Sequence, residues 1–381
     1  MLLELLQALF LENKNDVSFR EGFKFWMRFN YLVLFFCYKM VEYNKKYIYK
    51  MNGNIALVGC GRIGKRHAEQ AVKIGTLVAV CDVDKQKAKD FAAQYNATAY
   101  FSLEELLVGE KNITFISICT PNGLHAQHSI LSLNAGINVL CEKPLCISTF
   151  DGNKMIEAAL KTQKKLFVVK QNRYNPPIVF LKKLIEHNHL GDIFSFQINC
   201  FWNRPSDYYT DWKGTKKLDG GTLFTQFSHF IDLLYWLLGD VKTVKSFIKN
   251  FAHPAIEIED SGAVIFEMKS GAIGTLNYTV NSFEKNMEGS FAVFAEKGTV
   301  KVGGQYLNEL EYCHVHGIAV PDLPKGNPAN GYGFYQGSMS NHDKVYENVL
   351  QALETPGHNF ASGEEGLKTV EIIEKIYLNN R

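Results

Sequence analysis

The chain lacks the cysteine spacing of a structural metal site. Its 381 residues include 8 cysteines, but none form a Cys-x-x-Cys pair, and the closest two are Cys141 and Cys146. This scatter gives no sign of a zinc site or of a disulfide framework. We therefore predict no metal, and we expect reduced thiols in a cytoplasmic protein.

An excess of charge of one sign is also missing. The chain has 41 Lys and Arg against 39 Asp and Glu, of which 8 and 5 fall in residues 1–50, so residues 51–381 hold 33 and 34. A near-neutral body gives no sign of a nucleic-acid partner or of an anionic membrane surface. With 46% hydrophobic and 21% charged residues, the composition is that of a globular protein long enough for two domains.

Residues 1–50 lack proline and contain a single glycine, yet they carry 13 aromatic residues. Their apolar run at 31–38 is too short for a membrane span, which takes ~20 residues, and the pattern of a secretory signal is missing. A strand and a glycine turn begin directly after Met51. We expect Met51 to be the natural start and 1–50 to be an extension outside the native fold. The alternative is an amphipathic segment that docks on a membrane or a partner.

Residues 51–172 alternate apolar strands with helical patterns. Strands are expected at 54–59, 77–81, 115–119, 138–141 and 165–169, with helices at 66–74, 85–94, 104–107 and 125–134. This alternation predicts parallel βαβ units with right-handed crossovers. The expected fold is an α/β domain with a doubly wound parallel sheet of the Rossmann type.

The pattern changes after about residue 175, and residues 173–360 are expected to form an α+β domain. Alternating apolar and polar residues occur at 193–202, 243–251, 262–268, 272–280 and 290–295. They predict an open, mainly antiparallel sheet, covered on one face by a helix at 223–238. The uncovered face predicts a homodimer or homotetramer. In the last segment, 361–381, a packing helix is expected at 364–378.

A glycine-rich turn joins the first strand to the first helix and consists of Gly59, Cys60, Gly61, Arg62, Ile63 and Gly64. The first glycine permits the tight turn, the second lets the backbone approach a pyrophosphate, and the third allows close helix–strand contact. The helix N-terminus offers N–H groups to the phosphates. Asp82 ends the second strand, where a carboxylate binds both ribose hydroxyls, so NAD is predicted over NADP.

Two loops at the next strand ends should face the nicotinamide half of the cofactor, because ligands of such sheets bind outside the carboxyl ends of the strands. The first loop contains Thr120, Pro121, Asn122 and His125, and the second contains Glu142, Lys143 and Pro144. Lys143 can donate to a sugar hydroxyl, or accept its proton if the lysine pKa is lowered. Pro144 is a candidate for a cis peptide bond. The alternative for Lys143 is a solvated surface lysine.

A third segment begins with Asp219, Gly220 and Gly221 and continues into a helix that carries Thr225, Gln226, His229 and Asp232. On the helix, Gln226 and His229 share a face, and Asp232 is placed to hold His229 in one tautomer. A histidine with a pKa near neutrality is a suitable base for a hydroxyl that is being oxidised. The alternative is a core histidine satisfied by Asp232.

These motifs make the chain resemble the glucose–fructose oxidoreductase, inositol dehydrogenase and rhizopine catabolism family (Gfo/Idh/MocA) over roughly 52–378. The shared motifs are the glycine turn, Thr-Pro-Asn, Glu-Lys-Pro and Gly-Gly…His-x-x-Asp. The resemblance implies NAD-dependent oxidation of a sugar hydroxyl, with Lys143 and His229 flanking the carbon that gives up hydride. Many members have an aspartate at the position of Thr225, which argues against a plain inositol dehydrogenase.

Three further segments, 168–176, 212–215 and 331–342, are similar to the bacterial UDP-N-acetyl-2-amino-2-deoxyglucuronate dehydrogenases. Those enzymes oxidise the 3-hydroxyl of a UDP-sugar acid during synthesis of surface polysaccharides such as the O-antigen of lipopolysaccharide. The substrate implied is a small molecule that carries a diphosphate and a carboxylate. Its candidate binding residues are Lys143, Lys170, Asn172, Arg173, Tyr174, Lys213, Thr225, Gln226 and His229.

Two alternatives to this activity remain open. One is a related enzyme that acts on another sugar or on a cyclitol. The other is an NAD-binding sensor or scaffold that kept the fold and lost the chemistry. The intact Lys143 and His229 argue against the second alternative.

Overall fold

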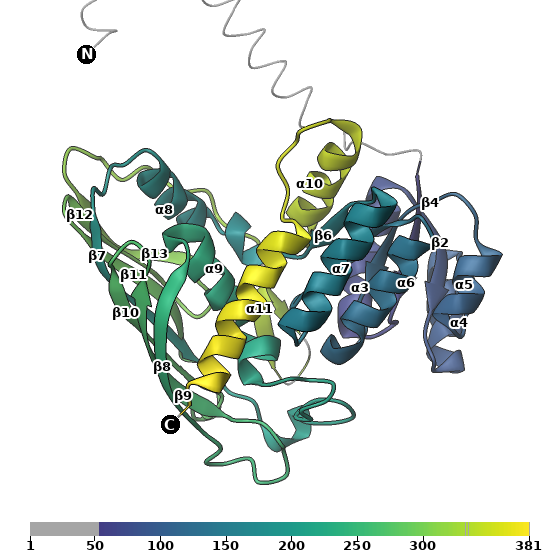
Figure 1. Cartoon of the computed structure of the whole chain (residues 1–381), viewed down its shortest axis with the longest axis horizontal. Coiled ribbons are helices and arrows are strands. Elements are labelled where there is room, and N and C mark those ends of the chain that lie inside the picture. Colours follow the sequence, from purple (N-terminus) through teal and green to yellow (C-terminus); the bar gives the residue numbers. More distant parts are fainter. Residues whose placement is uncertain (1–52, 332, 334, 381) are drawn as a thin grey trace, which may run out of the picture. The chain divides into compact units, whose positions relative to one another are not determined.

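The structure, a computed structural model, describes residues 53–331, 333 and 335–380 (Figure 1). The expectation that Met51 is the natural start concerns residues outside this described part. Two large sheets carry the fold, one of six strands and one of seven. None of the helices in the described ranges is both long and apolar enough to cross a lipid bilayer.

The six-stranded sheet has the order β3-β2-β1-β4-β5-β6, and every neighbouring pair is parallel. This is the strand order of a doubly wound Rossmann sheet, as predicted. Its strands are β1 (Asn54–Val58), β2 (Thr76–Cys81), β3 (Thr98–Tyr100), β4 (Ile113–Ile118), β5 (Asn138–Cys141) and β6 (Leu166–Val168). Its helices are α3 (Arg62–Ile74), α4 (Lys85–Tyr95), α5 (Leu103–Gly109), α6 (His125–Asn134) and α7 (Thr149–Thr162), with the short η1 (Asn122–Leu124) before α6.

Helices on both faces explain why these strands are continuously apolar. In β1, Ile55, Ala56 and Leu57 are all buried, as expected for a strand covered from both sides. On α3, the small residues Gly64, Ala68 and Ala71 form the buried stripe. They allow the helix to approach the sheet closely, directly after the glycine turn.

The seven-stranded sheet has the order β13-β12-β11-β7-β10-β9-β8 and is mainly antiparallel, with one parallel pair between β7 and β10. Its strands are β7 (Ile193–Phe201), β8 (Val241–Lys249), β9 (Ser261–Met268), β10 (Ile273–Thr279), β11 (Glu288–Ala295), β12 (Gly298–Gly303) and β13 (Glu309–Val315). A separate hairpin consists of β14 (Ala329–Gly331) and β15 (Gln336–Met339).

Figure 1 shows the helices of this half on one side of the seven-stranded sheet. These helices are α8 (Pro176–Glu186), α9 (Ser228–Leu238) and α11 (Gly363–Leu378). The same part of the chain also contains three shorter helical turns, η2 (Gln171–Tyr174), η3 (Ser206–Tyr208) and η4 (Leu223–Phe227). Phe196, Ile198 and Cys200 point to this covered side and are buried. The opposite face of the sheet carries exposed apolar residues: Phe247, Ile265, Ile273 and Phe294.

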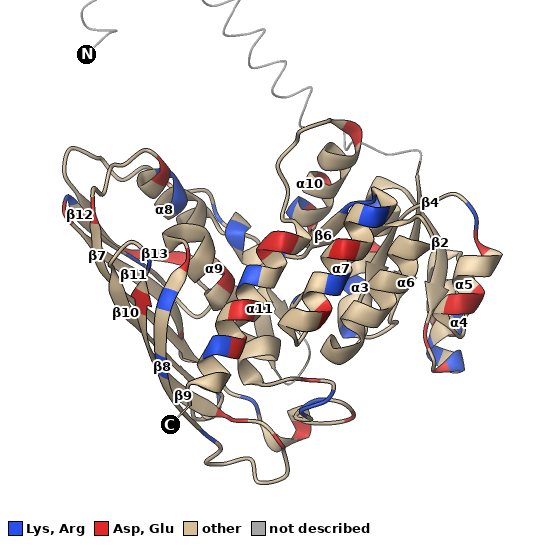
Figure 2. Cartoon of the chain, in the orientation of Figure 1, with Lys and Arg blue, Asp and Glu red and all other residues tan. Residues whose placement is uncertain are grey.

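The last two helices connect the two sheets. The helix α10 (His342–Glu354) packs against α3, while α11 contacts both α7 and α9. Thr149, at the start of α7, donates its backbone N–H to Glu374 of α11 at 3.0 Å. Basic and acidic residues are interspersed along the ribbons of both halves (Figure 2), in agreement with the near-neutral charge of the sequence.

Candidate active site

The glycine turn after β1 has the geometry that its sequence predicts. Gly59 has a φ of +101°, and a Cβ atom there would lie 2.5 Å from the carbonyl oxygen of Cys119. A Cβ atom at Gly64 would lie 2.1 Å from the carbonyl oxygen of Gly59. Neither position has room for a side chain, so the turn can pass this close to β4 and α3 only with glycine.

Gly61 differs from both because a Cβ atom there would meet nothing within 4 Å. It begins α3, whose N-terminus has no side-chain cap and no acidic residue in its first turn. Open space in front of free N–H groups at a helix N-terminus suits a pyrophosphate. The turn therefore fits the phosphates of a dinucleotide.

Asp82, at the end of β2, lies beside this turn. Its carboxylate accepts hydrogen bonds from the backbone N–H of Cys60 at 2.8 Å and of Asp84 at 2.9 Å. These two bonds fix the carboxylate at the carboxyl edge of the sheet, where the ribose of a dinucleotide lies in this fold.

The loop after β4 forms hydrogen bonds to the neighbouring segments. Asn122 donates to the carbonyl of Asp219 at 2.9 Å and to the hydroxyl of Thr225 at 2.7 Å. The ring nitrogens of His125 lie 2.7 Å from the carbonyl of Pro144 and 2.8 Å from that of Thr120. The loop thus ties the segment of Lys143 to the helix of His229.

Lys143 reaches across to that helix. Its Nζ donates to the carbonyl oxygen of Thr225 at 2.6 Å, and the bond between Lys143 and Pro144 is cis. Burial lowers the pKa of Lys143 to about 8, and the positive charges of Arg204 and Lys170 act in the same direction. A lysine with this pKa exchanges its proton close to neutral pH, which a solvated surface lysine does not do.

His229 lies on α9 one helical turn after Thr225 and is buried. Burial, followed by the charge of Lys143, holds the pKa of His229 well below its usual range. No hydrogen bond between described residues involves the His229 ring. The imidazole is therefore neutral, and its nitrogens are open to a ligand.

The expectation that Asp232 orients His229 is wrong. Arg173 donates to both oxygens of Asp232, at 2.8 and 2.7 Å, and Lys170 Nζ lies 2.9 Å away. Burial opposes the ionisation of Asp232, but the two cations outweigh it and hold its pKa far below the usual range. A carboxylate pairs more strongly with two full positive charges than with a neutral imidazole.

These ion pairs involve two of the residues that were expected to bind the substrate. Lys170 and Arg173 are buried and use their charges inside the protein, and Arg173 pairs with Glu365 as well, at 2.5 Å. With Tyr174 they line a cavity of about 380 Å³ that includes neither Lys143 nor His229. Asn172 is buried, and its Oδ1 has no partner among the described residues.

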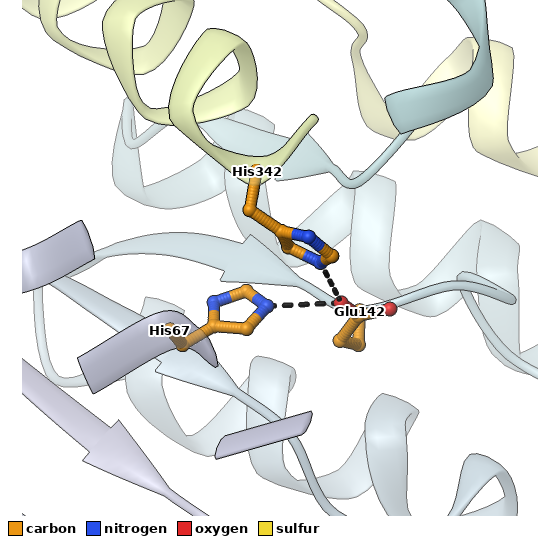
Figure 3. A group of neighbouring side chains, drawn as sticks. All are labelled: His67, Glu142 and His342. Atoms are coloured by element: carbon orange, nitrogen blue, oxygen red, sulfur yellow. Dashed lines mark hydrogen bonds and ion pairs between the residues drawn. The ribbon is translucent and has the colours of Figure 1, made fainter. Parts of the chain in front are cut away.

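The carboxylate of Glu142 is held by two histidines (Figure 3). Its Oε1 lies 2.9 Å from His67 Nε2 and 3.1 Å from His342 Nε2, and its Oε2 accepts the backbone N–H of Lys143 at 2.9 Å. Burial alone would raise the pKa of Glu142, but the hydrogen bonds of His342 and His67 hold it well below its usual range. Glu142 thus positions the backbone of Lys143 and has little capacity left for a cofactor.

The direction of the hydrogen bonds behind Glu142 follows from its charge. An ionised carboxylate only accepts, so His67 Nε2 must donate to it. Burial lowers the pKa of His67, and the Nδ1 of the neutral ring must accept, from the Tyr346 hydroxyl at 2.9 Å. The Ser117 hydroxyl, 2.9 Å from that of Tyr346, then donates to Tyr346.

The remaining candidates lie around Thr225 and Gln226. The hydroxyl of Thr225 donates to the carboxylate of Asp219. Gln226 accepts from Arg204 Nε at 2.7 Å and donates to the Tyr208 hydroxyl at 2.6 Å. Lys213 is half-buried over the Tyr208 ring. Sequence reasoning did not identify Arg204 or Tyr208, although the Trp202-Asn-Arg-Pro sequence at the end of the alternating strand was an available signal.

A glycine turn for phosphates, with a lysine at the carboxyl edge of the same sheet and a buried histidine of α9 near enough to feel its charge, defines a Rossmann-type oxidoreductase. The model of the oxidoreductase family with an NAD-binding Rossmann fold, GFO_IDH_MocA, matches residues 53–170. The model of the GFO/IDH/MocA C-terminal domain matches residues 178–301. The chain belongs to the GFO/IDH/MocA family, and its parallel-sheet half is the NAD-binding domain.

Similar solved structures include two WlbA dehydrogenases, each in complex with NADH and UDP-GlcNAcA. The one from Chromobacterium violaceum is 34% identical, with a TM-score of 0.79, covering 88% of this chain and 96% of that chain. The one from Bordetella pertussis is 33% identical, with a TM-score of 0.77, covering 86% and 96%. Glucose-6-phosphate 3-dehydrogenase of Bacillus subtilis is 23% identical over 339 residues, 85% of this chain and 95% of its own length.

Proposed function

We propose that this chain oxidises the 3-hydroxyl of a UDP-activated sugar acid, UDP-N-acetyl-2-amino-2-deoxyglucuronate, with NAD as the cofactor. The observation that carries the proposal is the placement of Lys143, whose Nζ contacts the Thr225 carbonyl 2.6 Å away and whose pKa is about 8. A low-pKa lysine beside an unpaired buried histidine is a suitable site for moving a hydroxyl proton.

The bound cofactor would supply the acceptor for the hydride. The chain's own residues hold it: the turn from Gly59 to Gly64 would carry the pyrophosphate, and Asp82 would bind the ribose hydroxyls. The negative charge of Asp82 would repel a 2′-phosphate, which supports NAD over NADP.

We assign Lys143 as the base that accepts the proton of the oxidised hydroxyl. Sequence reasoning favoured a histidine of near-neutral pKa as the base, but burial makes His229 a much weaker base than its usual pKa suggests. The pKa of Lys143 lies closer to neutral pH, so Lys143 is the better acceptor. His229, as a neutral imidazole, would orient the same hydroxyl through one hydrogen bond.

The identity of the sugar rests on the relatives. The two structures that share about a third of their residues with this chain contain UDP-GlcNAcA. Inositol 2-dehydrogenases are similar over a smaller part of the chain, 28% identical over 225 residues. Thr225, bonded to Asp219 and Asn122, stands where many members of the family have aspartate, which argues against a plain inositol dehydrogenase.

The test is NADH formation, followed at 340 nm, with UDP-GlcNAcA, UDP-GlcNAc and myo-inositol as separate substrates. We expect turnover with UDP-GlcNAcA and a product two mass units lighter. Lys143→Met should lower turnover by ~10²–10⁴-fold, the range for a positioned acid–base group, while NADH still binds. Faster oxidation of myo-inositol than of UDP-GlcNAcA would contradict the proposal.

A further inference from the structure

Arg204 is a buried cation without an acidic partner. It follows β7, is 2% exposed and ranks among the largest fully buried side chains. No carboxylate within the described ranges pairs with it. Its hydrogen bonds go to neutral oxygens: from Nε to Gln226 at 2.7 Å, from Nη1 to the Asn203 carbonyl at 2.6 Å and to Asn286 at 3.2 Å, and from Nη2 to the Gln336 carbonyl at 3.4 Å.

This environment contrasts with that of Lys170 and Arg173, which share the carboxylate of Asp232. Aromatic faces surround Arg204 instead, with its Cζ 5.1, 5.4 and 5.0 Å from the ring centres of Trp202, Tyr208 and Tyr335. Such faces offset only part of the cost of burying a charge. The positive charge therefore remains largely uncompensated within the protein.

Arg204 also lies next to the reacting centre. Its acceptor Gln226 follows Thr225, whose carbonyl oxygen binds Lys143 Nζ. The charge of Arg204 is one of the causes that lower the pKa of Lys143. A group bound by Arg204 would thus be attached to the sugar that reacts at Lys143, rather than to a distant part of the ligand.

The surroundings of Arg204 are positive as well. Lys213 Nζ lies 5.3 Å from the centre of the Tyr208 ring, and Arg62 Cζ lies 5.6 Å from that of Tyr335. Tyr208 and Tyr335 are in edge contact, with ring centres 5.1 Å apart. The two tyrosines therefore hold three cations around one region, against the nearby carboxylates of Asp219 and Asp211, and this excess of positive charge favours a ligand of negative charge.

We propose that Arg204 binds a carboxylate on the sugar ring of the substrate and thereby selects sugar acids over neutral sugars. The inference rests on the proposed function and names the residue that determines its substrate class. A guanidinium N–H forms a charge-assisted hydrogen bond to a carboxylate oxygen, which is stronger than a hydrogen bond between neutral groups. The donor that turns to the ligand is Nη2, whose 3.4 Å contact with Gln336 is the longest that Arg204 makes.

The test is equilibrium binding of UDP-GlcNAcA and UDP-GlcNAc to the NADH-loaded protein by titration calorimetry, because this pair differs in the carboxylate alone. We expect the wild type to bind the acid more tightly. Arg204→Gln should weaken binding of the acid by roughly 10- to 100-fold, the range for a lost charge-assisted hydrogen bond. Binding of UDP-GlcNAc should change by less than about threefold, since it makes no such bond.

Two variants serve as controls. Arg204→Lys keeps the charge without the planar guanidinium and should give an intermediate preference, so it carries the test if Arg204→Gln does not fold. Lys161→Gln removes a positive charge from the exposed end of α7 and should leave both affinities unchanged. NADH binding and thermal melting of each variant verify that it is folded.

The outcomes separate this inference from the proposed function. If the wild type shows no preference for the acid, or binds neither ligand, the assignment of Arg204 is wrong. The assignment is also wrong if Arg204→Gln weakens the binding of both ligands equally. Arg204 would then bind the diphosphate that both ligands carry. If the acid is preferred through Arg204 but is not oxidised with NAD, the binding assignment holds and the proposed reaction fails.

Discussion

Arg173 holds both carboxylate oxygens of Asp232, through Nε at 2.8 Å and Nη2 at 2.7 Å, and both residues are buried. Lys170 contacts the same carboxylate at 2.9 Å. Removing the negative charge would leave two buried cations poorly compensated. This pair is therefore expected to support the stability of the fold rather than the chemistry of His229.

Asp232→Asn is expected to lower the free energy of unfolding by about 3–5 kcal/mol, the usual cost of breaking a buried ion pair. Urea unfolding at pH 7 measures it. Asp240→Asn, which breaks the exposed pair with Lys269, is the matched control and should cost less than about 1 kcal/mol. Equal effects of the two substitutions would contradict the prediction.

The contribution of Asp232 should also depend on pH in a defined direction. The pKa of Asp232 is depressed in the folded protein, so its stabilisation is present above the unfolded pKa of ~3.9 and is lost as the pH falls below it. The difference in unfolding free energy between wild type and Asp232→Asn should shrink between about pH 4 and pH 2. A constant difference over that range would be inconsistent with this linkage.

The pH dependence of turnover should identify the base. Lys143 accepts a proton only when it is deprotonated, so kcat/KM should rise with pH and level off above the lysine pKa of about 8. Lys143→Met should lose ~10²–10⁴-fold in kcat and should lack this limb, while it still binds NADH. If Lys143→Met still shows this rise of kcat/KM with pH, Lys143 is not the group that accepts the proton.

Tyr346 is predicted to position Lys143 at a distance, through His67 and Glu142. Tyr346→Phe leaves the buried His67 Nδ1 without a donor and frees the ring to change tautomer. We expect kcat to fall by roughly 2- to 10-fold, the worth of one neutral hydrogen bond, with little change in the KM for NAD. Lys143→Met would abolish the activity that Tyr346→Phe only reduces.

The control is Tyr95→Phe, because the buried Tyr95 hydroxyl has no hydrogen-bond partner among the described residues. It removes the same atom from another part of the Rossmann half. If Tyr346→Phe has no more effect on kcat than Tyr95→Phe, the hydrogen bonds from Tyr346 through His67 to Glu142 do not position Lys143.

Asp82 should determine the choice of cofactor. Its carboxylate is fixed by the N–H groups of Cys60 and Asp84, so it cannot turn away from a 2′-phosphate. The wild type should bind NADH more tightly than NADPH, and Asp82→Ala should lose most of this preference. Fluorescence titration with the two reduced cofactors measures it, and tighter binding of NADPH by the wild type would refute the assignment.

The open face of the seven-stranded sheet should join two copies of the chain. The strand register places Phe247, Ile265, Ile273 and Phe294 on the same face, and Ile265 and Phe294 are 59% and 42% exposed. We expect a homodimer or homotetramer by light scattering at micromolar concentration, and monomers for Ile265→Lys with Phe294→Lys. Leu160→Lys, at an exposed site on α7, is the control and should not dissociate the assembly.

The parallel half of the fold was largely predictable because its signals are local. The helix at 125–134 and the strand at 138–141 have the predicted bounds, and the other predicted strands differ by one or two residues at an end. The helices α7, α8 and α10 were not predicted, and neither were the strands β3, β12, β13, β14 and β15. The strands among them are short, whereas α8 and α10 bury residues at helical spacing, a local signal that the prediction did not use.

The residues of the candidate site were predictable where a single sequence motif contains them. Their hydrogen-bond and ion-pair partners were not predictable where these come from distant segments of the chain. Lys143 and His229 were identified from their motifs. Asp232 was paired with the wrong residue, because helical spacing from His229 was visible and the cations at 170 and 173 were not. Arg204 was missed for the same reason, since Tyr335 and Gln336 reach it from more than a hundred residues away.

The widened turn η4 (Leu223–Phe227), which has π-helical geometry, lies directly before α9. A π turn holds one residue more than an α-helical turn over the same path. If the same residues were wound as a regular α-helix instead, everything after the turn would be rotated by about 100° relative to Thr222, which precedes it. His229 would then swing away from Lys143 without any change in either side chain. The angular alignment of His229 with Lys143 is thus set by the wide turn, whose Thr225 carbonyl also accepts a hydrogen bond from Lys143 Nζ, and changes that close this turn would silence the site more readily than many substitutions.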